Sequence, residues 1–273
     1  MKRLFSGIIY VVLVVSALLL RQFVDYRIFC ALIFALTGIS ACEMANVTKG
    51  VVSKATTVCT IVFGFLLVPV MFVAELFFSG YGWVFGLSLI ALSLVVNLVL
   101  YCVGEKTKKS LMFAFVNALY PTVFMVLVML CNQLPNIRGF VSMVILFAVS
   151  ACADVFAYFI GRLLKGPKLW PELSPKKTWA GAFGAVIGGV LCSLLIYLVF
   201  GMPNGLFNWW IFLLIGVVSS VLNIFGDLFE SFIKRSLGIK DIGNIMPGHG
   251  GVLDRIDGLV FVTLFVYPIM LLL

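Results

Sequence analysis

The densest group of side chains able to do chemistry lies in one stretch of the chain, residues 226–257. It holds five of the eleven carboxylates and the only histidine. Several of its polar residues recur at spacings of three and four, which places them on one face of an expected helix. This polar face consists of Asp227, Glu230, Ser231, Lys234 and Arg235. Carboxylates suit a hard divalent cation, and Lys and Arg suit phosphate oxygens. The stretch therefore predicts chemistry on a phosphate group.

Asp254 and Asp257 form a second carboxylate pair, three residues apart and so on one helical face. A membrane-spanning helix needs about 20 residues, so counting back from Leu273 places the start of the last span near Asp254. A helix N-terminus favours anions. We therefore predict that Asp227 and Asp254 lie at the same membrane surface and bind Mg²⁺, which takes one or two carboxylates together with substrate phosphates. The alternative is that Asp254 only caps its helix.

The remaining polar residues of the stretch fit binding of phosphate groups. Lys234, Arg235, Lys240 and Arg255 could neutralise phosphate oxygens, the arginines in bidentate fashion. His249 lies among glycines, which let the backbone approach a ligand closely. Its role stays open between a base, a donor to phosphate and a structural donor, with a donor favoured over a base.

The spacing of these residues resembles the signature of the CDP-diacylglycerol synthases, the phosphatidate cytidylyltransferases: S-x-x-K-R-x4-K-D…P-x-H-G-G-x-x-D-R-x-D. The matching residues are Ser231, Lys234, Arg235, Lys240, Asp241, Pro247, His249, Gly250, Gly251, Asp254, Arg255 and Asp257. Two further blocks are similar to the family, ADVFAYFIGR around Asp154 and SPKKTW at 174–179. The chain departs from the pattern at Ala180, where many relatives carry Glu or Gln.

The resemblance implies the reaction of phosphatidate with CTP to give CDP-diacylglycerol and pyrophosphate. It also implies a homodimer and a Mg²⁺ cofactor, with room for a second cation. The residues expected to act in catalysis are Asp227, Asp254, Asp257, Lys234, Arg235 and His249, with Asp227 and Asp254 as metal ligands. The residues expected to bind substrate are Lys176, Lys177, Thr178, Ser231, Lys240, Asp241, Arg255 and Asp154.

Two of these expectations also come from local sequence. Asp154 lies in an apolar run, where a carboxylate is costly and marks a functional candidate; a structural pair with Arg162 is the alternative. Ser174 before a proline indicates a helix start, which would place Lys176 to Thr178 in the first turn of a helix. Donors and positive charge there would seat a triphosphate or a lipid phosphate. As a bare basic loop the segment would be a topology signal only.

The composition defines the elements that must position these residues. The 273-residue chain is 63% hydrophobic and 11% charged, with a mean hydropathy of +1.20, which excludes a soluble globular domain. Seven cysteines without CxxC pairs argue against zinc and disulfides. We predict an all-α polytopic membrane protein of about nine spans. The expected spans are 4–20, 23–42, 57–78, 83–103, 111–131, 139–160, 180–200, 208–229 and 254–273.

The net charge of +8 indicates orientation in the membrane and not a nucleic-acid partner. With nine spans, 16 of the 19 Lys and Arg residues fall on the N-terminal side. The positive-inside rule then predicts a cytoplasmic N-terminus and an outer C-terminus. We expect a multi-pass protein of the inner (plasma) membrane whose active site faces the cytoplasm.

The two halves of the chain are expected to differ in role. Residues 1–135 should pack helices and contact lipid, with Glu43 in a solvated loop at 43–56 and Glu75 near a membrane interface. Residues 136–273 should form the catalytic half, with cytoplasmic loops at 161–179 and 230–255.

Two other functions are compatible with parts of the pattern. One is a related lipid-phosphate enzyme, such as a CTP-dependent polyprenol kinase or an archaeal-lipid cytidylyltransferase. The other is a transporter, although its ionisable residues would be expected to line a pathway at mid-membrane.

Overall fold

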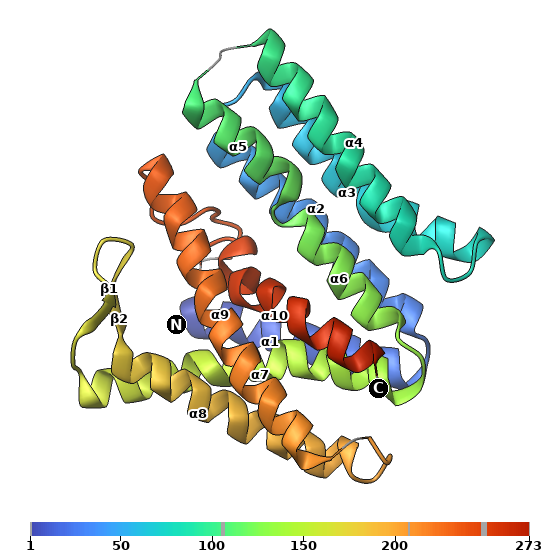
Figure 1. Cartoon of the computed structure of the whole chain (residues 1–273), viewed down its shortest axis with the longest axis vertical. Helices are drawn as coiled ribbons and strands as arrows, with labels where there is room; N and C mark the ends of the chain where they lie inside the picture. The colour runs from blue at the N-terminus through green and yellow to red at the C-terminus, as the bar shows by residue number, and fades with distance from the viewer. Residues whose placement is uncertain (1, 105–106, 207, 247–249, 273) are drawn as a thin grey trace. The chain divides into compact units, whose positions relative to one another are not determined.

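The computed structural model describes residues 2–104, 107–206, 208–246 and 250–272. Helices dominate the described chain, with one small hairpin (Figure 1). In chain order the elements are α1 (Lys2–Phe23), α2 (Tyr26–Thr48), α3 (Lys54–Phe77), α4 (Gly82–Val103), α5 (Lys108–Leu119), α6 (Thr122–Gln133), α7 (Asn136–Leu164), β1 (Lys168–Trp170), β2 (Ser174–Thr178), α8 (Trp179–Ile196), a π-helical turn (Tyr197–Gly201), α9 (Trp209–Leu237) and α10 (Leu253–Leu271).

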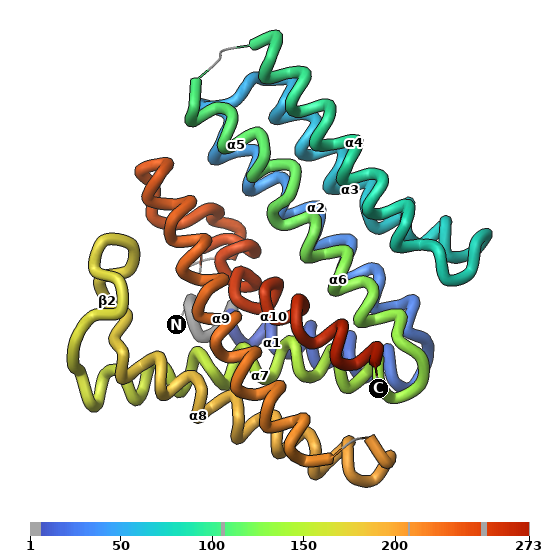
Figure 2. The backbone as a smooth tube through the Cα atoms, viewed as in Figure 1, coloured from blue at the N-terminus to red at the C-terminus, as the bar shows by residue number. Residues whose placement is uncertain are grey.

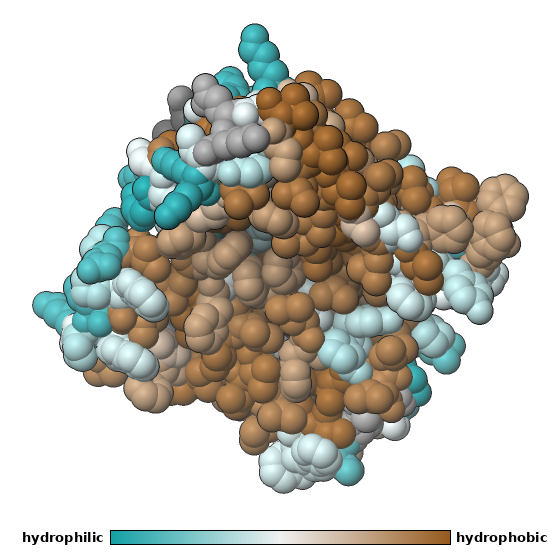
Figure 3. All heavy atoms as spheres, turned by 45° about the horizontal axis from the view of Figure 1, so that its top comes forward, coloured by the Kyte–Doolittle hydropathy of each residue, from teal (hydrophilic) through white to brown (hydrophobic). Residues whose placement is uncertain are grey.

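Among the described residues, seven helical segments are long and apolar enough to cross a membrane, with α5 and α6 counted together as 108–133. The prediction of a polytopic helical membrane protein is therefore confirmed. The apolar part of α1, Gly7–Phe23, is shorter, and α10 is not among the seven. The count of nine and the orientation of the termini stay predictions. The face drawn in Figure 3 is mostly apolar, with hydrophilic side chains toward its edges, as lipid contact requires.

The chain divides into two compact units, which we call the first unit, Met1–Leu130 with Ile239–Arg255, and the second unit, Cys131–Gly238 with Ile256–Leu273. In the first unit, α2, α3, α4 and α5 lie side by side (Figures 1 and 2). Gly64 of α3 has no space for a Cβ because Ala41 of α2 packs against it. Asn117 of α5 donates to the Thr48 hydroxyl of α2 at 2.9 Å, and both residues are buried.

The expectation of a solvated loop beginning at residue 43 is wrong, because α2 continues to Thr48. Glu43 is therefore a helical residue, and only 4% of its surface is exposed. An acidic residue after an apolar run indicates a span end when its surroundings are unknown. Here the carboxylate is satisfied by backbone donors from near the other end of the sequence, and hydrophobic periodicity carries no trace of such partners.

In the second unit, α8 packs against both α7 and α9 through a surface of small residues. Gly184 and Gly188 contact Ile160 and Phe156 of α7, and Gly189 contacts Ser220 of α9, each without space for a Cβ. Small residues at these positions let the helices approach one another closely.

The segment before α8 differs from the expectation. Residues 174–178 do not form a first helical turn; they form strand β2, which pairs antiparallel with β1. The helix begins after Thr178, whose hydroxyl accepts a hydrogen bond from the Gly181 N–H at 3.1 Å. A capping hydroxyl at Thr178 and pairing with residues 168–170 together outweigh the helix-start signal of Ser174 and its proline. The hairpin is the local exception to the all-α prediction.

Candidate functional site

The polar face predicted from sequence lies on α9, which runs from Trp209 to Leu237 and so continues beyond the end of the expected span at residue 229. Most of this face is inside the second unit. Glu230 has no exposed surface, and Ser231 is also buried. The Lys234 ammonium lies 3.3 Å from Glu230 Oε1, one helical turn away. The Ser231 hydroxyl makes a long contact of 3.5 Å with Asp227 Oδ1. Asp227 is less enclosed, with 39% of its side chain exposed.

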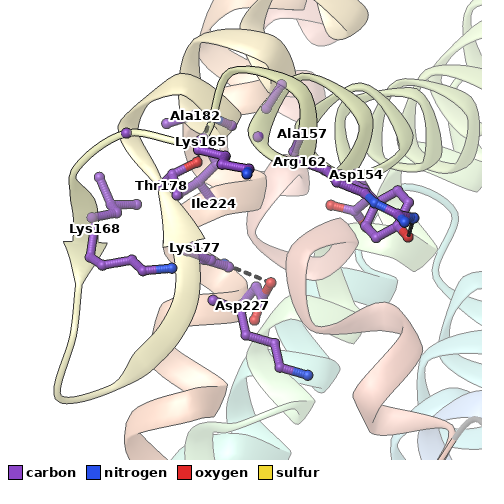
Figure 4. A pocket seen from close by; sticks show the side chains of 17 residues that line it. Asp154, Ala157, Arg162, Lys165, Lys168, Lys177, Thr178, Ala182, Ile224 and Asp227 are labelled. Atoms are coloured by element: carbon purple, nitrogen blue, oxygen red, sulfur yellow. Dashed lines mark hydrogen bonds and ion pairs between the residues drawn. The ribbon is translucent and has the colours of Figure 1, made fainter.

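A cavity of about 510 Å³ opens in the second unit between α7, the hairpin, α8 and α9. One wall is apolar and includes Ala157, Ala182 and Ile224 (Figure 4). Two carboxylates line it, Asp154 and Asp227. Five cationic side chains line it as well: Arg162, Lys165, Lys168, Lys176 and Lys177. The lining is thus net positive, which suits a ligand with several negative charges.

One ion pair crosses this cavity. Lys177 of β2 points toward Asp227 of α9, and its Nζ lies 2.6 Å from Asp227 Oδ2 (Figure 4). Both side chains are partly exposed, at 24% and 39%. Strand β2 carries both lysines to this cavity, where Lys176 is exposed and Lys177 is half-buried. The structure therefore brings together two of the residues predicted from separate motifs.

Asp154 also lines this cavity, from α7. Its Oδ1 accepts a 2.7 Å hydrogen bond from the side-chain amide of Asn223 on α9. Arg162, the alternative partner expected from sequence, donates instead to the Tyr158 hydroxyl at 2.9 Å. Sequence reasoning missed Asn223, although a buried amide in an apolar helix four residues before Asp227 is a detectable signal.

Within the second unit, α9 crosses α10 closely at residues 257 and 258. A Cβ on Gly226 of α9 would meet the Asp257 carbonyl oxygen and lie 2.8 Å from the Gly258 Cα. A Cβ on Gly258 would overlap the Asn223 side chain. Asp257 Oδ1 accepts from the Gly258 N–H at 2.8 Å. Asp227 and Asp257 thus each neighbour a glycine at which α9 and α10 touch.

Asp254 lies in the first unit, one residue after the start of α10, as counting back from Leu273 predicted. Its carboxylate binds the backbone of the preceding loop. Oδ2 accepts from the N–H groups of Ile242, Gly243 and Gly251 at 3.0, 3.4 and 2.8 Å. Asp254 therefore binds the backbone at residues 242, 243 and 251, which is more than the single cap offered as an alternative.

Glu43 of α2 binds the same loop from the other side. Its Oε1 accepts from the Val252 N–H and its Oε2 from the Leu253 N–H, both at 2.9 Å. These are the first backbone donors of α10. A helix N-terminus attracts an anion, and at α10 that anion is a side chain of the protein itself.

The other predicted residues lie as follows. Arg235 Nε donates to the Leu173 carbonyl, at the turn of the hairpin, at 3.4 Å. Lys240, Asp241 and Arg255 are exposed in the first unit. His249 and Pro247 fall outside the described residues. The second unit thus brings together Asp154, Lys176, Lys177, Thr178 and Asp227 around one cavity, to which the sequence prediction did not assign Lys165 or Lys168.

A family model described as the cytidylyltransferase family matches residues 1–273. The chain belongs to the cytidylyltransferase family.

Two relatives illustrate how far the likeness within the cytidylyltransferase family extends. The chain is 46% identical over 129 residues to a phosphatidate cytidylyltransferase of Brucella abortus biovar 1. The aligned residues make up 47% of this chain and 46% of the relative. It is 48% identical over 117 residues to a phosphatidate cytidylyltransferase of Staphylococcus epidermidis, which is 42% of this chain and 44% of the relative. The chain therefore matches just under half the length of each relative.

The donors available for a cation in this member of the cytidylyltransferase family are carboxylates. Among the described residues, no group of three or more His, Cys, Asp or Glu side chains gathers as a metal centre. Asp227 fits one ligand position, since its carboxylate is partly exposed and already holds a cationic group, Lys177. On Asp254, Oδ2 accepts from three backbone N–H groups, and Oδ1 lies 3.3 Å from the Ile242 N–H, so this carboxylate is bound to the backbone of the protein.

Proposed function

We propose that this protein transfers the CMP group of CTP to the phosphate of phosphatidate, forming CDP-diacylglycerol and pyrophosphate. The observation that carries the proposal is the net-positive cavity of the second unit, where Lys177 and Asp227 face each other. Its volume of about 510 Å³ falls in the usual range for small-molecule sites, about 300–1,000 Å³. Membership of the cytidylyltransferase family and the names of the relatives support the same reaction.

In this proposal a phosphate oxygen of the lipid attacks the α-phosphorus of CTP. The bond from that phosphorus to the oxygen bridging the β-phosphate breaks, and pyrophosphate leaves with the electron pair. Such a transfer needs neutralised charge and aligned groups more than a protein nucleophile. Lys177 and the other cations of the cavity would bind the phosphates. Lys234 and Arg235, about two turns beyond Asp227 on α9, would support them.

We also propose a dependence on Mg²⁺. Mg²⁺ keeps several waters and binds through one or two carboxylates together with substrate phosphates, so the small number of carboxylates around Asp227 suits it. When bound, the ion would neutralise charge on the phosphate oxygens. Asp227 would hold it, and Asp254 as a second ligand and a second cation stay predictions.

The setting in the cell follows from the charge distribution. We propose nine spans, an N-terminus in the cytoplasm, a C-terminus outside and a location in the inner membrane, with the basic hairpin facing the cytoplasm where CTP is found. A homodimer is part of the proposal through the family resemblance.

The test is an assay of the purified protein in detergent with CTP labelled in the cytidine, parallel CTP labelled in the γ-phosphate, phosphatidate and Mg²⁺. We expect cytidine label in lipid and γ-label in pyrophosphate. Transfer of γ-label to a lipid would instead indicate a kinase, and no transfer to polyprenol, archaeal or phosphatidate acceptors would favour a transporter.

A variant ties the activity to the cavity. Asp227→Asn keeps the size of the side chain but removes its charge, and we expect turnover to fall by about a thousandfold, equivalent to about 4 kcal/mol. Glu172→Gln, which changes an exposed carboxylate that does not line the cavity, is the comparison and should change turnover by less than about threefold. Equal effects of the two substitutions would contradict the assignment of the site.

A further inference from the structure

Glu43 contributes a side chain from the N-terminal helices to the segment that carries the family signature. Its carboxylate is almost fully buried, at 4% exposure. It accepts one hydrogen bond on each oxygen, from the backbone N–H groups of Val252 and Leu253. A carboxylate that accepts two backbone N–H groups at a helix N-terminus forms charge-assisted bonds that also complement the helix dipole.

The backbone around Glu43 has no space for anything larger than glycine. A Cβ on Gly251 would lie 2.5 Å from both Glu43 oxygens, and a Cβ on Gly243 would overlap Oε1. A Cβ on Gly243 would also lie 2.8 Å from the Gly251 Cα, so these two glycines pack against each other beside the carboxylate. Gly251 belongs to the signature, and Glu43 supplies a physical reason for glycine there.

The same two glycines connect Glu43 to Asp254. The N–H groups of Gly243 and Gly251 both donate to Asp254 Oδ2. Glu43 thus fixes one side of this backbone layer and Asp254 fixes the other. A movement of the layer away from Glu43 would change the direction of the Asp254 carboxylate.

We propose that Glu43 is a positioning residue that holds residue 243 and residues 251–253 against α2 and thereby orients Asp254 for the reaction. We call the hydrogen bonds from Val252 and Leu253 to Glu43 the clamp. The expected effect on turnover rests on the proposed function, whereas the clamp itself does not. It gives the N-terminal helices a role in the active site in addition to packing and lipid contact.

The chain offers a matched control in Glu75. Its two oxygens also accept two backbone N–H groups, from Gly80 at 2.8 Å and Gly82 at 3.1 Å, at the turn between α3 and α4. The chemistry is the same as at Glu43, but the turn carries no residue of the signature. Glu43→Gln and Glu75→Gln each place an amide NH₂ group opposite a backbone N–H, and each should lower thermal stability, Glu43→Gln by more because Glu43 is buried and Glu75 only partly buried.

The first readout is amide hydrogen exchange of the substrate-free protein, followed by mass spectrometry on peptides from 239–255. We expect Glu43→Gln to speed exchange there by about tenfold or more, because the amides lose their acceptor. Glu75→Gln should leave these peptides unchanged. Unchanged exchange in the Glu43→Gln protein would overturn the clamp, whatever reaction the protein performs.

The second readout separates positioning from stability. Glu43→Gln should lower kcat by at least about tenfold while KM for CTP changes less than about threefold, and Glu75→Gln should change neither. Glu43→Asp keeps a carboxylate, serves also if the Gln variant fails to fold, and should recover part of kcat. Wild-type kcat in a Glu43→Gln protein with accelerated exchange would show a structural clamp only and overturn the positioning role. Absence of CMP transfer by the wild-type protein would reject the proposed function separately. The hydrogen-exchange measurement would still show whether Glu43 holds the backbone at residues 252 and 253.

Discussion

The ammonium group of Lys177 has two roles that compete. It is paired with Asp227 at 2.6 Å, and it lines the cavity in which phosphates are proposed to bind. Phosphate oxygens attract Lys as strongly as a carboxylate does, so a bound substrate would draw the same group away from Asp227. Lys176, the next residue along β2, lines the cavity but is exposed.

This difference predicts unequal effects of two neighbouring substitutions. Lys177→Ala should lower kcat/KM for CTP by about a hundredfold, and Lys176→Ala by less than about tenfold, because an exposed charge is screened by water. Steady-state kinetics at fixed phosphatidate would measure both, and Lys168→Ala would report on a cavity lysine from β1. Equal losses for Lys176 and Lys177 would mean that the ion pair with Asp227 has no special part in binding.

Among single residues, the sequence predicted those that lie in a recognisable short motif. Asp227, Lys177 and Asp154 lie in recognisable blocks, and each lines the cavity. Asn223 and Glu43 were missed because their partners, Asp154 and Val252, are 69 and 209 residues away. No property of a short window reveals such a pairing.

Among the elements, α9 and α10 pack backbone against backbone at Gly226. Gly226 meets backbone atoms of Asp257 and Gly258, which cannot move aside as a flexible side chain could. The position and direction of Asp227 depend on this contact, since it follows Gly226 directly. Helix α9 was predicted closely from its polar face, and the start of α10 by counting from Leu273. The hairpin was not predicted, because strand pairing depends on residues 168–170, where the charge pattern indicated only a basic loop.

The contact of α9 with α10 predicts that a larger residue at Gly226 will destabilise the protein. Gly226→Ala should destabilise the protein by about 1–3 kcal/mol, the usual cost of an overpacked site, and lower its midpoint of thermal unfolding in detergent. Gly50→Ala is the control, since a Cβ there would meet no atom within 4 Å, and its midpoint should be unchanged. A Gly226→Ala protein as stable as Gly50→Ala would show that the two helices separate at little cost.

For the whole chain, the charge asymmetry that indicates orientation is independent of the fold. Residues 166–172 lie in the hairpin together with the basic residues Lys168, Lys176 and Lys177, whereas residues 202–206 carry no charge. The positive-inside rule therefore places these two exposed segments on opposite sides of the membrane in the nine-span topology.

Cysteine labelling tests this topology directly. In a background with the native cysteines replaced, Glu172→Cys should react only with a reagent on the cytoplasmic side, and Asn204→Cys only with one outside. Both positions are exposed, so accessibility to reagent should not limit the reaction. Labelling of both from the same side would contradict the nine-span count. Hydropathy alone could not decide it, because seven segments are clearly apolar while α1 and α10 are shorter or interrupted by charge.

The bond between Glu43 and Leu253 also has a consequence for how the protein is made. The two residues are 210 positions apart, so at a synthesis rate of about 5–20 residues per second the donors follow the acceptor by roughly 10–40 s. During that interval α2 is inserted with a carboxylate whose backbone partners have not been translated. The packing around α2 at Glu43 is therefore incomplete until residues 252 and 253 have been translated.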